Sequence, residues 1–170
     1  AIDATKTMKD QAVNKQAGDM NVGYDQNPKF SPDGRYVAWL SMERNGYESD
    51  RNRLCMYNLA TGEKTYLTES FDSNVDDFCW SDTKDAMIYF IGVWHATENL
   101  YAITKKGEVK QLTDYCADFG SLQMLGDHKH ILAERHSYGE PADLYVITPG
   151  KDIAKTAIVQ ITAENKHITD

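Results

Sequence analysis

The sequence has few of the features that would mark a disulfide-rich, membrane or nucleic-acid-binding protein. Cysteine occurs three times in 170 residues, at positions 55, 79 and 116, and this odd, widely spaced set does not fit a zinc knuckle. No apolar run approaches the roughly 18 residues that a membrane helix requires, so we expect no membrane partner. No signal-peptide pattern stands at the start. The net charge of −8 comes without a Lys/Arg cluster, which argues against a nucleic-acid partner.

The composition is that of one folded domain. Hydrophobic residues make up 41% and charged residues 26% of the chain, which is too apolar for a disordered protein and enough to bury a core. Cys55 and Cys79 stand inside apolar runs and are expected to be buried thiols. The chain opens with Ala-Ile-Asp and no initiator Met, as we expect of a processed protein or of a segment of a longer one.

The stretch "FSPDGRYVAWLS", residues 30–41, joins a tight turn to an apolar strand. The order Ser31-Pro32-Asp33-Gly34 is the one that a type I β-turn favours, because proline presets φ at the second place and glycine suits the fourth. The residues that follow are apolar at both odd and even positions. A strand of this kind is covered on both faces, so the stretch predicts a turn that leads into a buried strand.

Similar segments recur along the chain with a period near 45 residues. Leu54, Leu100 and Leu144 are 46 and 44 residues apart, and the residues Thr68, Thr113 and Thr162 are 45 and 49 apart. Each unit offers four short β-prone runs, and the fourth ends in Leu-Thr or Ile-Thr. Gly62 and Gly107 stand in the turn before the fourth run, where a positive φ is tolerated. Runs such as "AMIYFIG" are β-branched and aromatic without a 3.6-residue period, which excludes a helical solenoid.

Four strands per unit at this period predict an all-β fold, a partial β-propeller of about three four-stranded antiparallel blades. Closed propellers need more blades than three, so we expect a piece of a larger ring whose terminal blades have unpaired edges. The expected parts are the end of a preceding blade, three blades and the lead into the next one: 1–25, 26–68, 76–113, 119–162 and 163–170.

The blade pattern "FSPDGRYVAWLS … RLCMYNLATGEKTYLT" resembles the propeller repeats of the prolyl oligopeptidase family of serine peptidases and those of TolB-type proteins. The longer stretch 23–68 resembles the propellers of bacterial dipeptidyl-peptidase and acylaminoacyl-peptidase members, and its loop "MERNGYESD" favours the peptidases. The resemblance covers most of residues 20–162. The later units depart from it at the turn, where they have "SDTKD" and "GDHK".

The resemblance implies a non-catalytic propeller that gates and orients short peptide substrates and packs on a C-terminal α/β-hydrolase domain. That domain would carry the Ser-Asp-His triad with its nucleophile in a G-x-S-x-G elbow. This chain has no such elbow, so we expect no catalytic residue in it. The resemblance also implies a periplasmic or secreted location. Two alternatives are a TolB-like protein-interaction propeller without an enzyme domain and a repeat protein whose ring is completed by oligomerisation.

Candidate binding residues come from the loops between the second and third strands of each unit, because function on such scaffolds gathers in loops. These loops are expected to be long and to meet the partner domain or the substrate. An acidic side chain there could hold the α-amino group of a peptide by a charge-assisted hydrogen bond. The candidates are Glu43, Arg44, Tyr47, Glu48, Trp94, His95, Glu98, His136, Tyr138 and Glu140.

No cofactor and no metal site are expected. The run 72–77 begins like a calcium loop, but it lacks the glycine at the sixth place and has Thr83 where a bidentate Glu should stand. His128 and His130 have the spacing of two ligands on one strand face, but the sequence offers no third ligand. Trp39 and Trp80 occupy strand positions and are expected to pack between blades.

Overall fold

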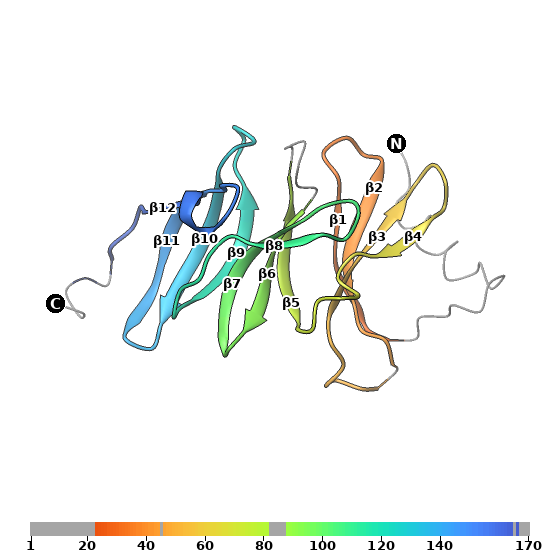
Figure 1. Ribbon diagram of the computed structural model, residues 1–170, viewed down its shortest axis with the longest axis horizontal. Helices are drawn as coiled ribbons and strands as arrows, with labels where there is room; N and C mark the ends of the chain where they lie inside the picture. Colours follow the sequence, from red (N-terminus) through yellow and green to blue (C-terminus); the bar gives the residue numbers. More distant parts are fainter. Residues whose placement is uncertain (1–22, 45, 82–87, 165, 167–170) are drawn as a thin grey trace.

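The computed structural model describes residues 23–44, 46–81, 88–164 and 166 and contains three four-stranded antiparallel sheets in chain order. These sheets are the expected blades, called blade 1, blade 2 and blade 3 (Figure 1). A short 3-10 helix, η2 (Ile153–Lys155), precedes the last strand. The strands are β1 (Asp25–Phe30), β2 (Tyr36–Ser41), β3 (Arg53–Asn58) and β4 (Lys64–Tyr66) in blade 1, β5 (Val75–Trp80), β6 (Ile88–Trp94), β7 (Thr97–Ile103) and β8 (Val109–Gln111) in blade 2, and β9 (Asp118–Met124), β10 (Ile131–Ser137), β11 (Glu140–Thr148) and β12 (Ala157–Gln160) in blade 3.

The all-β architecture predicted from the repeat is therefore confirmed. Within each blade the strands pair with their neighbours in the chain, as in a meander. Residues 1–22 and 167–170, in which the sequence predicts parts of adjoining blades, lie outside the described residues. None of the helices among the described residues is long and apolar enough to cross a membrane.

The turn between β1 and β2 of blade 1 has the predicted geometry. The Gly34 amide donates to the Ser31 carbonyl at 2.9 Å, which closes a four-residue turn, and Gly34 has a φ of 67°. The Asp33 carboxylate accepts from the Ser31 hydroxyl at 2.7 Å. Hydrogen bonds from the Ser31 hydroxyl and from the amide and guanidinium of Arg35 lower the pKa of Asp33 to about 2, so the turn keeps its charged cap through the physiological range. The strand after it, β2, is buried on both faces, as expected.

The repeated Leu and Thr residues bind each other in every blade. The Thr68 hydroxyl accepts a hydrogen bond from the amide of Leu54 at 2.8 Å, and the blade 2 and blade 3 pairs, Thr113 with Leu100 and Thr162 with Leu144, have the same 2.8 Å separation. Each threonine stands just beyond the end of the fourth strand. Its hydroxyl accepts from an amide of the third strand that has no partner left on the fourth strand. The sequence period thus marks one hydrogen bond that is repeated three times.

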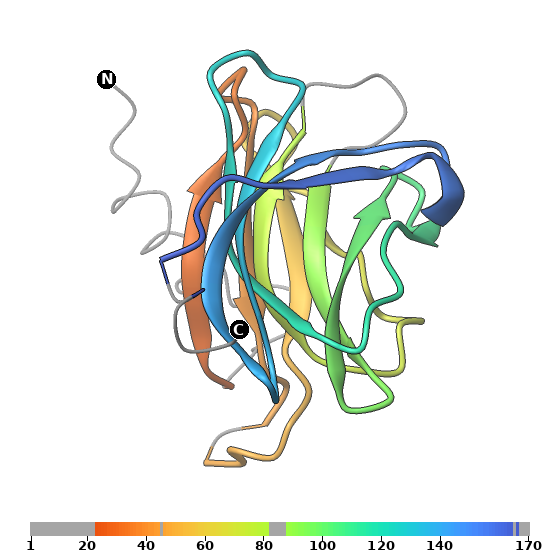
Figure 2. The ribbon, with the colours of Figure 1, turned by 90° about the vertical axis from the view of Figure 1, so that its left-hand side faces the viewer.

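The blades pack face against face through apolar side chains. Between blades 1 and 2 the core includes Leu40, Leu54, Phe78 and Phe90, all at most 1% exposed. A second core between blades 2 and 3 is built by the opposite face of blade 2 together with Phe119, Ile131 and Ile147. Figure 2 views this stack from the blade 3 side. Both faces of blade 2 are covered, which is why its strands are apolar at odd and even positions.

Two predictions about single side chains have different outcomes. Cys55 and Cys79 are buried, as expected, and burial raises the pKa of each thiol to about 12. Trp80 packs between blades 1 and 2. Trp39 lies instead on the face of blade 1 that is turned away from blade 2, in a small cluster with Val37 and Cys55. The prediction of inter-blade packing is therefore confirmed for Trp80, and for Trp39, which points to the opposite face of blade 1, it stays a prediction.

Candidate functional site

The connections β2–β3 (42–52), β6–β7 (95–96) and β10–β11 (138–139) leave the sheets at one end, which is the lower end in Figure 1. We call the surface formed by these connections and by the linkers 67–74 and 112–117 the lower face. In a meander, successive connections emerge at opposite ends of the sheet. The second-to-third connections of all three blades therefore gather on this face. All ten candidate residues lie on these connections or close to the strand ends beside them.

Two of the three connections are much shorter than the sequence predicts. β6 and β7 are joined by His95 and Ala96 alone, with φ values of 52° and 60°. β10 and β11 are joined by Tyr138 and Gly139. The expectation of long loops in blades 2 and 3 is therefore wrong. It failed because polar residues were taken to indicate a loop, whereas they occupy strand ends beside a tight turn. Of the candidates there, four lie on strands: Trp94, Glu98, His136 and Glu140.

The long β2–β3 loop of blade 1 is organised around Arg44 and Asp50. The Arg44 amide donates to one Asp50 oxygen at 2.7 Å, and its guanidinium Nε donates to the other at 2.9 Å. The same guanidinium lies 3.9 Å from the Tyr47 ring centroid. The hydrogen bond from Arg44 lowers the pKa of Asp50. Arg44 and Tyr47 therefore hold the shape of the loop, while Glu48 is exposed on it.

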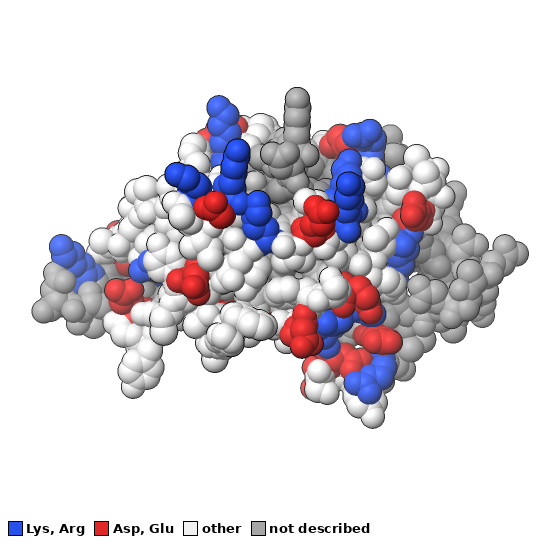
Figure 3. All heavy atoms as spheres, in the orientation of Figure 1, with Lys and Arg blue, Asp and Glu red and all other residues white. Residues whose placement is uncertain are grey.

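Arg53, which sequence reasoning missed, anchors the base of this loop. It is buried, with its guanidinium 4.4 Å from the Tyr66 ring. Its ion-pair partners are Glu43 at 3.8 Å and Glu69 at 3.4 Å. The candidate Glu43 thus shares the single positive charge of Arg53 with a second carboxylate. Figure 3 shows acidic and basic side chains intermixed at the lower end of blade 1, with no broad area of one sign on the face in view.

A carboxyl cluster lies where blades 2 and 3 meet. Asp118 on β9 accepts a hydrogen bond from the Glu98 amide at 2.9 Å, and its other oxygen lies 3.7 Å from Nε2 of His136. The Glu98 carboxyl shares a hydrogen bond with Asp76. Desolvation raises the pKa of Asp76, and it raises that of Glu98 together with the negative charges of Asp76 and Asp118. The fold thus joins the candidates Glu98 and His136 through two acids that the sequence did not single out.

Beside this cluster, Trp94 and His95 present aromatic surface. Their rings stack with centroids 4.6 Å apart, and the Thr97 hydroxyl donates to the Trp94 carbonyl at 2.8 Å. Trp94 remains nearly half exposed.

Among the described residues, no group of three His, Cys, Asp or Glu side chains could hold a metal ion.

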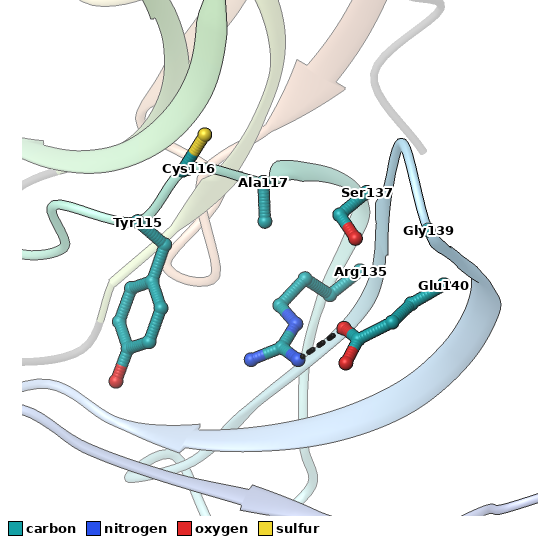
Figure 4. A pocket seen from close by; sticks show the side chains of 7 residues that line it. All are labelled: Tyr115, Cys116, Ala117, Arg135, Ser137, Gly139 and Glu140. Atoms are coloured by element: carbon teal, nitrogen blue, oxygen red, sulfur yellow. Dashed lines mark hydrogen bonds and ion pairs between the residues drawn. The ribbon is translucent and has the colours of Figure 1, made fainter. Parts of the chain in front are cut away.

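A pocket of about 550 Å³ opens next to the β10–β11 hairpin (Figure 4). Arg135 of β10 lies in it, with Tyr115 on one side and Glu140 on the other. Nη2 of Arg135 donates to a Glu140 oxygen at 3.1 Å. The rest of the lining comes from the linker before β9 and from the hairpin. Arg135 is a further residue that the loop-based search did not find, since it lies on a strand.

Comparison with known proteins identifies the family. Residues 1–142 match the family model described as the dipeptidyl peptidase IV (DPP IV) N-terminal region. The chain belongs to this family. It is 45% identical over 151 residues to dipeptidyl-peptidase 5 of Porphyromonas gingivalis. The alignment covers 88% of this chain and 21% of that protein. The chain thus spans about a fifth of the length of this relative.

Solved structures share the fold. The β-propeller domain of the Trilobed protease from Pyrococcus furiosus aligns with a TM-score of 0.59 at 18% identity, covering 78% of this chain and 36% of that one. TolB from Acinetobacter baumannii aligns with a TM-score of 0.58 at 18% identity, covering 80% and 32%. Together with the three blades, these similarities establish a β-propeller architecture. The resemblance to peptidase propellers inferred from the repeat is confirmed by the family match.

Proposed function

We propose that this chain is a non-catalytic propeller segment of a serine peptidase of the dipeptidyl-peptidase type. Its lower face orients and gates short peptides, and it packs on an α/β-hydrolase domain elsewhere in the parent protein. The observation that carries this proposal is the 45% identity to a dipeptidyl-peptidase 5, about a fifth of whose length aligns with this chain. A periplasmic or secreted location is part of the same proposal, and fractionation of the source cells tests it.

The carboxyl cluster gives the lower face a way to recognise peptides. A peptide with a free N terminus carries an ammonium group below a pH of about 8. Carboxylates of Glu98, Asp76 and Asp118 can accept charge-assisted hydrogen bonds from that group. Because the pKa values of Asp76 and Glu98 are raised, these two acids take up protons at a higher pH than ordinary carboxyl groups do. Recognition of the ammonium group therefore weakens as the pH falls.

The test uses the full-length protein that carries this chain. We expect it to release dipeptides from short peptides with a free N terminus and to act poorly on N-acetylated ones. Glu98→Gln removes the negative charge and lowers kcat/KM for free N termini by about ten-fold or more, the effect of losing one charged hydrogen bond. The loss shrinks as the pH falls, because the raised pKa of wild-type Glu98 makes it take up a proton before an ordinary glutamate does.

The matched control is Glu134→Gln, which removes the same charge from an exposed position on β10. This variant keeps wild-type kcat/KM. A full-length protein that cleaves no peptide would contradict the peptidase proposal and favour a TolB-like interaction propeller. Equal losses in the two variants would contradict the specific role of Glu98 and leave the peptidase proposal intact.

A further inference from the structure

Arg135 is held in a fixed position near the lower end of β10, an inner strand of blade 3. Its side chain is 18% exposed, and its guanidinium lies 4.3 Å from the Tyr145 ring centroid and 5.7 Å from that of Tyr115. Rings at these distances attract the cation through their π faces. The guanidinium therefore keeps its place whether or not a carboxylate accompanies it.

The protein neutralises this cation weakly. Among the described residues, Glu140 is the one carboxylate paired with Arg135, through a single hydrogen bond at 3.1 Å. Nε of Arg135 is buried without a hydrogen-bond partner in the part of the chain that the structure describes. Asp143 lies opposite Arg135 in the β10–β11 register, but its carboxylate accepts from Thr162 and Gln160.

Two carboxylate-paired arginines of the lower face show the contrast, whereas Arg51 donates to two backbone carbonyls. Arg44 is paired with the buried carboxylate of Asp50 by both Nε and its backbone amide. Nε of Arg53 is also buried without a hydrogen-bond partner among the described residues, but Arg53 has two carboxylates within 4 Å. Arg135 has one, on a side chain that is 59% exposed. Of the three, Arg135 is the one that lines the pocket.

We propose that this pocket binds one carboxylate group of a peptide, with Arg135 as the binding residue and Glu140 as a built-in competitor. The planar guanidinium fork matches a carboxylate in geometry. An exposed ion pair such as Arg135–Glu140 is weak, so an incoming carboxylate displaces Glu140 into water with little loss. The Ser137 hydroxyl in the pocket lining supplies a further donor.

The surroundings favour a group with a single negative charge. The chain has a net charge of −8, and Glu140 and Asp143 both lie on the strand next to Arg135. A phosphate dianion meets twice the repulsion of a carboxylate at such a place. The preference for an anion is independent of the proposed peptidase role. The choice of a peptide as its carrier rests on that role.

The experiment measures binding by titration calorimetry on the full-length protein. The probes are three N-acetylated tripeptides: one with a free C-terminal carboxylate, one with an amidated C terminus and a central Glu, and one amidated and uncharged. We expect the first or the second to bind, which identifies the source of the carboxylate, and the uncharged peptide to bind at least ten-fold more weakly. The acetyl group keeps the ammonium-binding carboxylates out of the comparison.

Two variants at the site have opposite expected effects. Arg135→Lys keeps the charge but loses the fork, and lowers the association constant about ten-fold. Glu140→Gln removes the competitor, and raises it about three- to five-fold. Glu134→Gln, on the opposite face of β10, is the matched control and changes it less than two-fold. Because Glu140 is exposed, its variant tests the proposal even if a substitution of Arg135 impairs folding.

Several results would overturn the proposal. Equal binding of the charged and uncharged peptides would show that no carboxylate site exists. An association constant that Glu140→Gln lowers or leaves unchanged would show that Glu140 is not a competitor. If the full-length protein released no dipeptides but still bound a carboxylate through Arg135, the peptidase role alone would be contradicted. Loss of the binding site with intact dipeptide release would contradict this inference alone.

Discussion

The threonine that closes each blade is the residue on which the repeat depends most directly. Thr113 is 1% exposed, and its hydroxyl accepts from the Leu100 amide while donating to the Asn99 side chain at 2.8 Å. Thr113→Val keeps the shape and removes the hydroxyl, which leaves both groups buried without this partner. We expect the free energy of unfolding to fall by about 1–3 kcal/mol, as measured by denaturant titration of the propeller.

Thr113→Ser is the control for this prediction, because serine keeps the hydroxyl and loses only a methyl group. Its expected loss is about 1 kcal/mol or less. A serine variant that is as unstable as the valine variant would show that packing of the methyl group, and not the hydrogen bond, accounts for the repeated threonine.

Residues that recur at a regular spacing were predictable, whereas only part of the candidate site was. Leu54 and Thr68 have equivalents in the other two units, and Gly62 has the positive φ that its turn position predicts. Asp118 and Arg135 belong to no repeated pattern. Asp118 joins Glu98 from 20 residues away across a blade boundary, and a contact between blades leaves no period in the sequence of either.

At the scale of single elements, the sequence of the β6–β7 hairpin disagrees with its conformation. A two-residue turn of this kind favours Asn-Gly, because both residues have positive φ. The protein has His95 and Ala96 there, at φ 52° and 60°. A side chain in this left-handed region is strained by about 1 kcal/mol or more. This mismatch explains why the sequence predicted a loop where the structure has a tight hairpin.

Replacing Ala96 with glycine should relieve that strain. We expect Ala96→Gly to raise the free energy of unfolding by about 0.5–1 kcal/mol, since glycine adopts a positive φ without steric conflict. Hydrogen exchange of the β6 and β7 amides, followed by mass spectrometry, should slow correspondingly. Trp94 and His95 stay in place, so the variant tests the turn without removing a candidate residue.

The same substitution at Ala60 provides the control, because Ala60 stands in the β3–β4 turn without a positive φ. Ala60→Gly should lower the free energy of unfolding by about 0.5–1 kcal/mol through the added freedom of the unfolded chain. The two glycine variants thus have opposite expected signs. Destabilisation by both would contradict the strain assigned to Ala96.

At the scale of the whole molecule, one carboxylate on the first strand of blade 2 ties the first strands of all three blades together. Asp77 accepts from Lys29 of β1 at 2.9 Å and from the Leu122 amide of β9 at 2.7 Å. Asn27 donates to it at 3.1 Å. The Lys29 ammonium also lies 4.7 Å from the Phe78 ring centroid. No sequence pattern predicted this bridge, and the run 72–77 that contains Asp77 resembled an incomplete calcium loop.

Asp77→Ala therefore acts on the relation between blades and not within one of them. It leaves the Leu122 amide without its acceptor and Lys29 without its counter-charge, and we expect the free energy of unfolding to fall by about 2–3 kcal/mol. Exchange at the Leu122 amide should become at least ten-fold faster in the full-length protein. Asp77→Asn keeps an oxygen for the Leu122 amide and should lose about half as much. Asp72→Ala, at an exposed acid in the preceding linker, should change nothing beyond about 0.5 kcal/mol. If Asp77→Ala weakened only the strands of blade 2, the bridge would not couple the blades, and their apolar faces alone would hold the arc together.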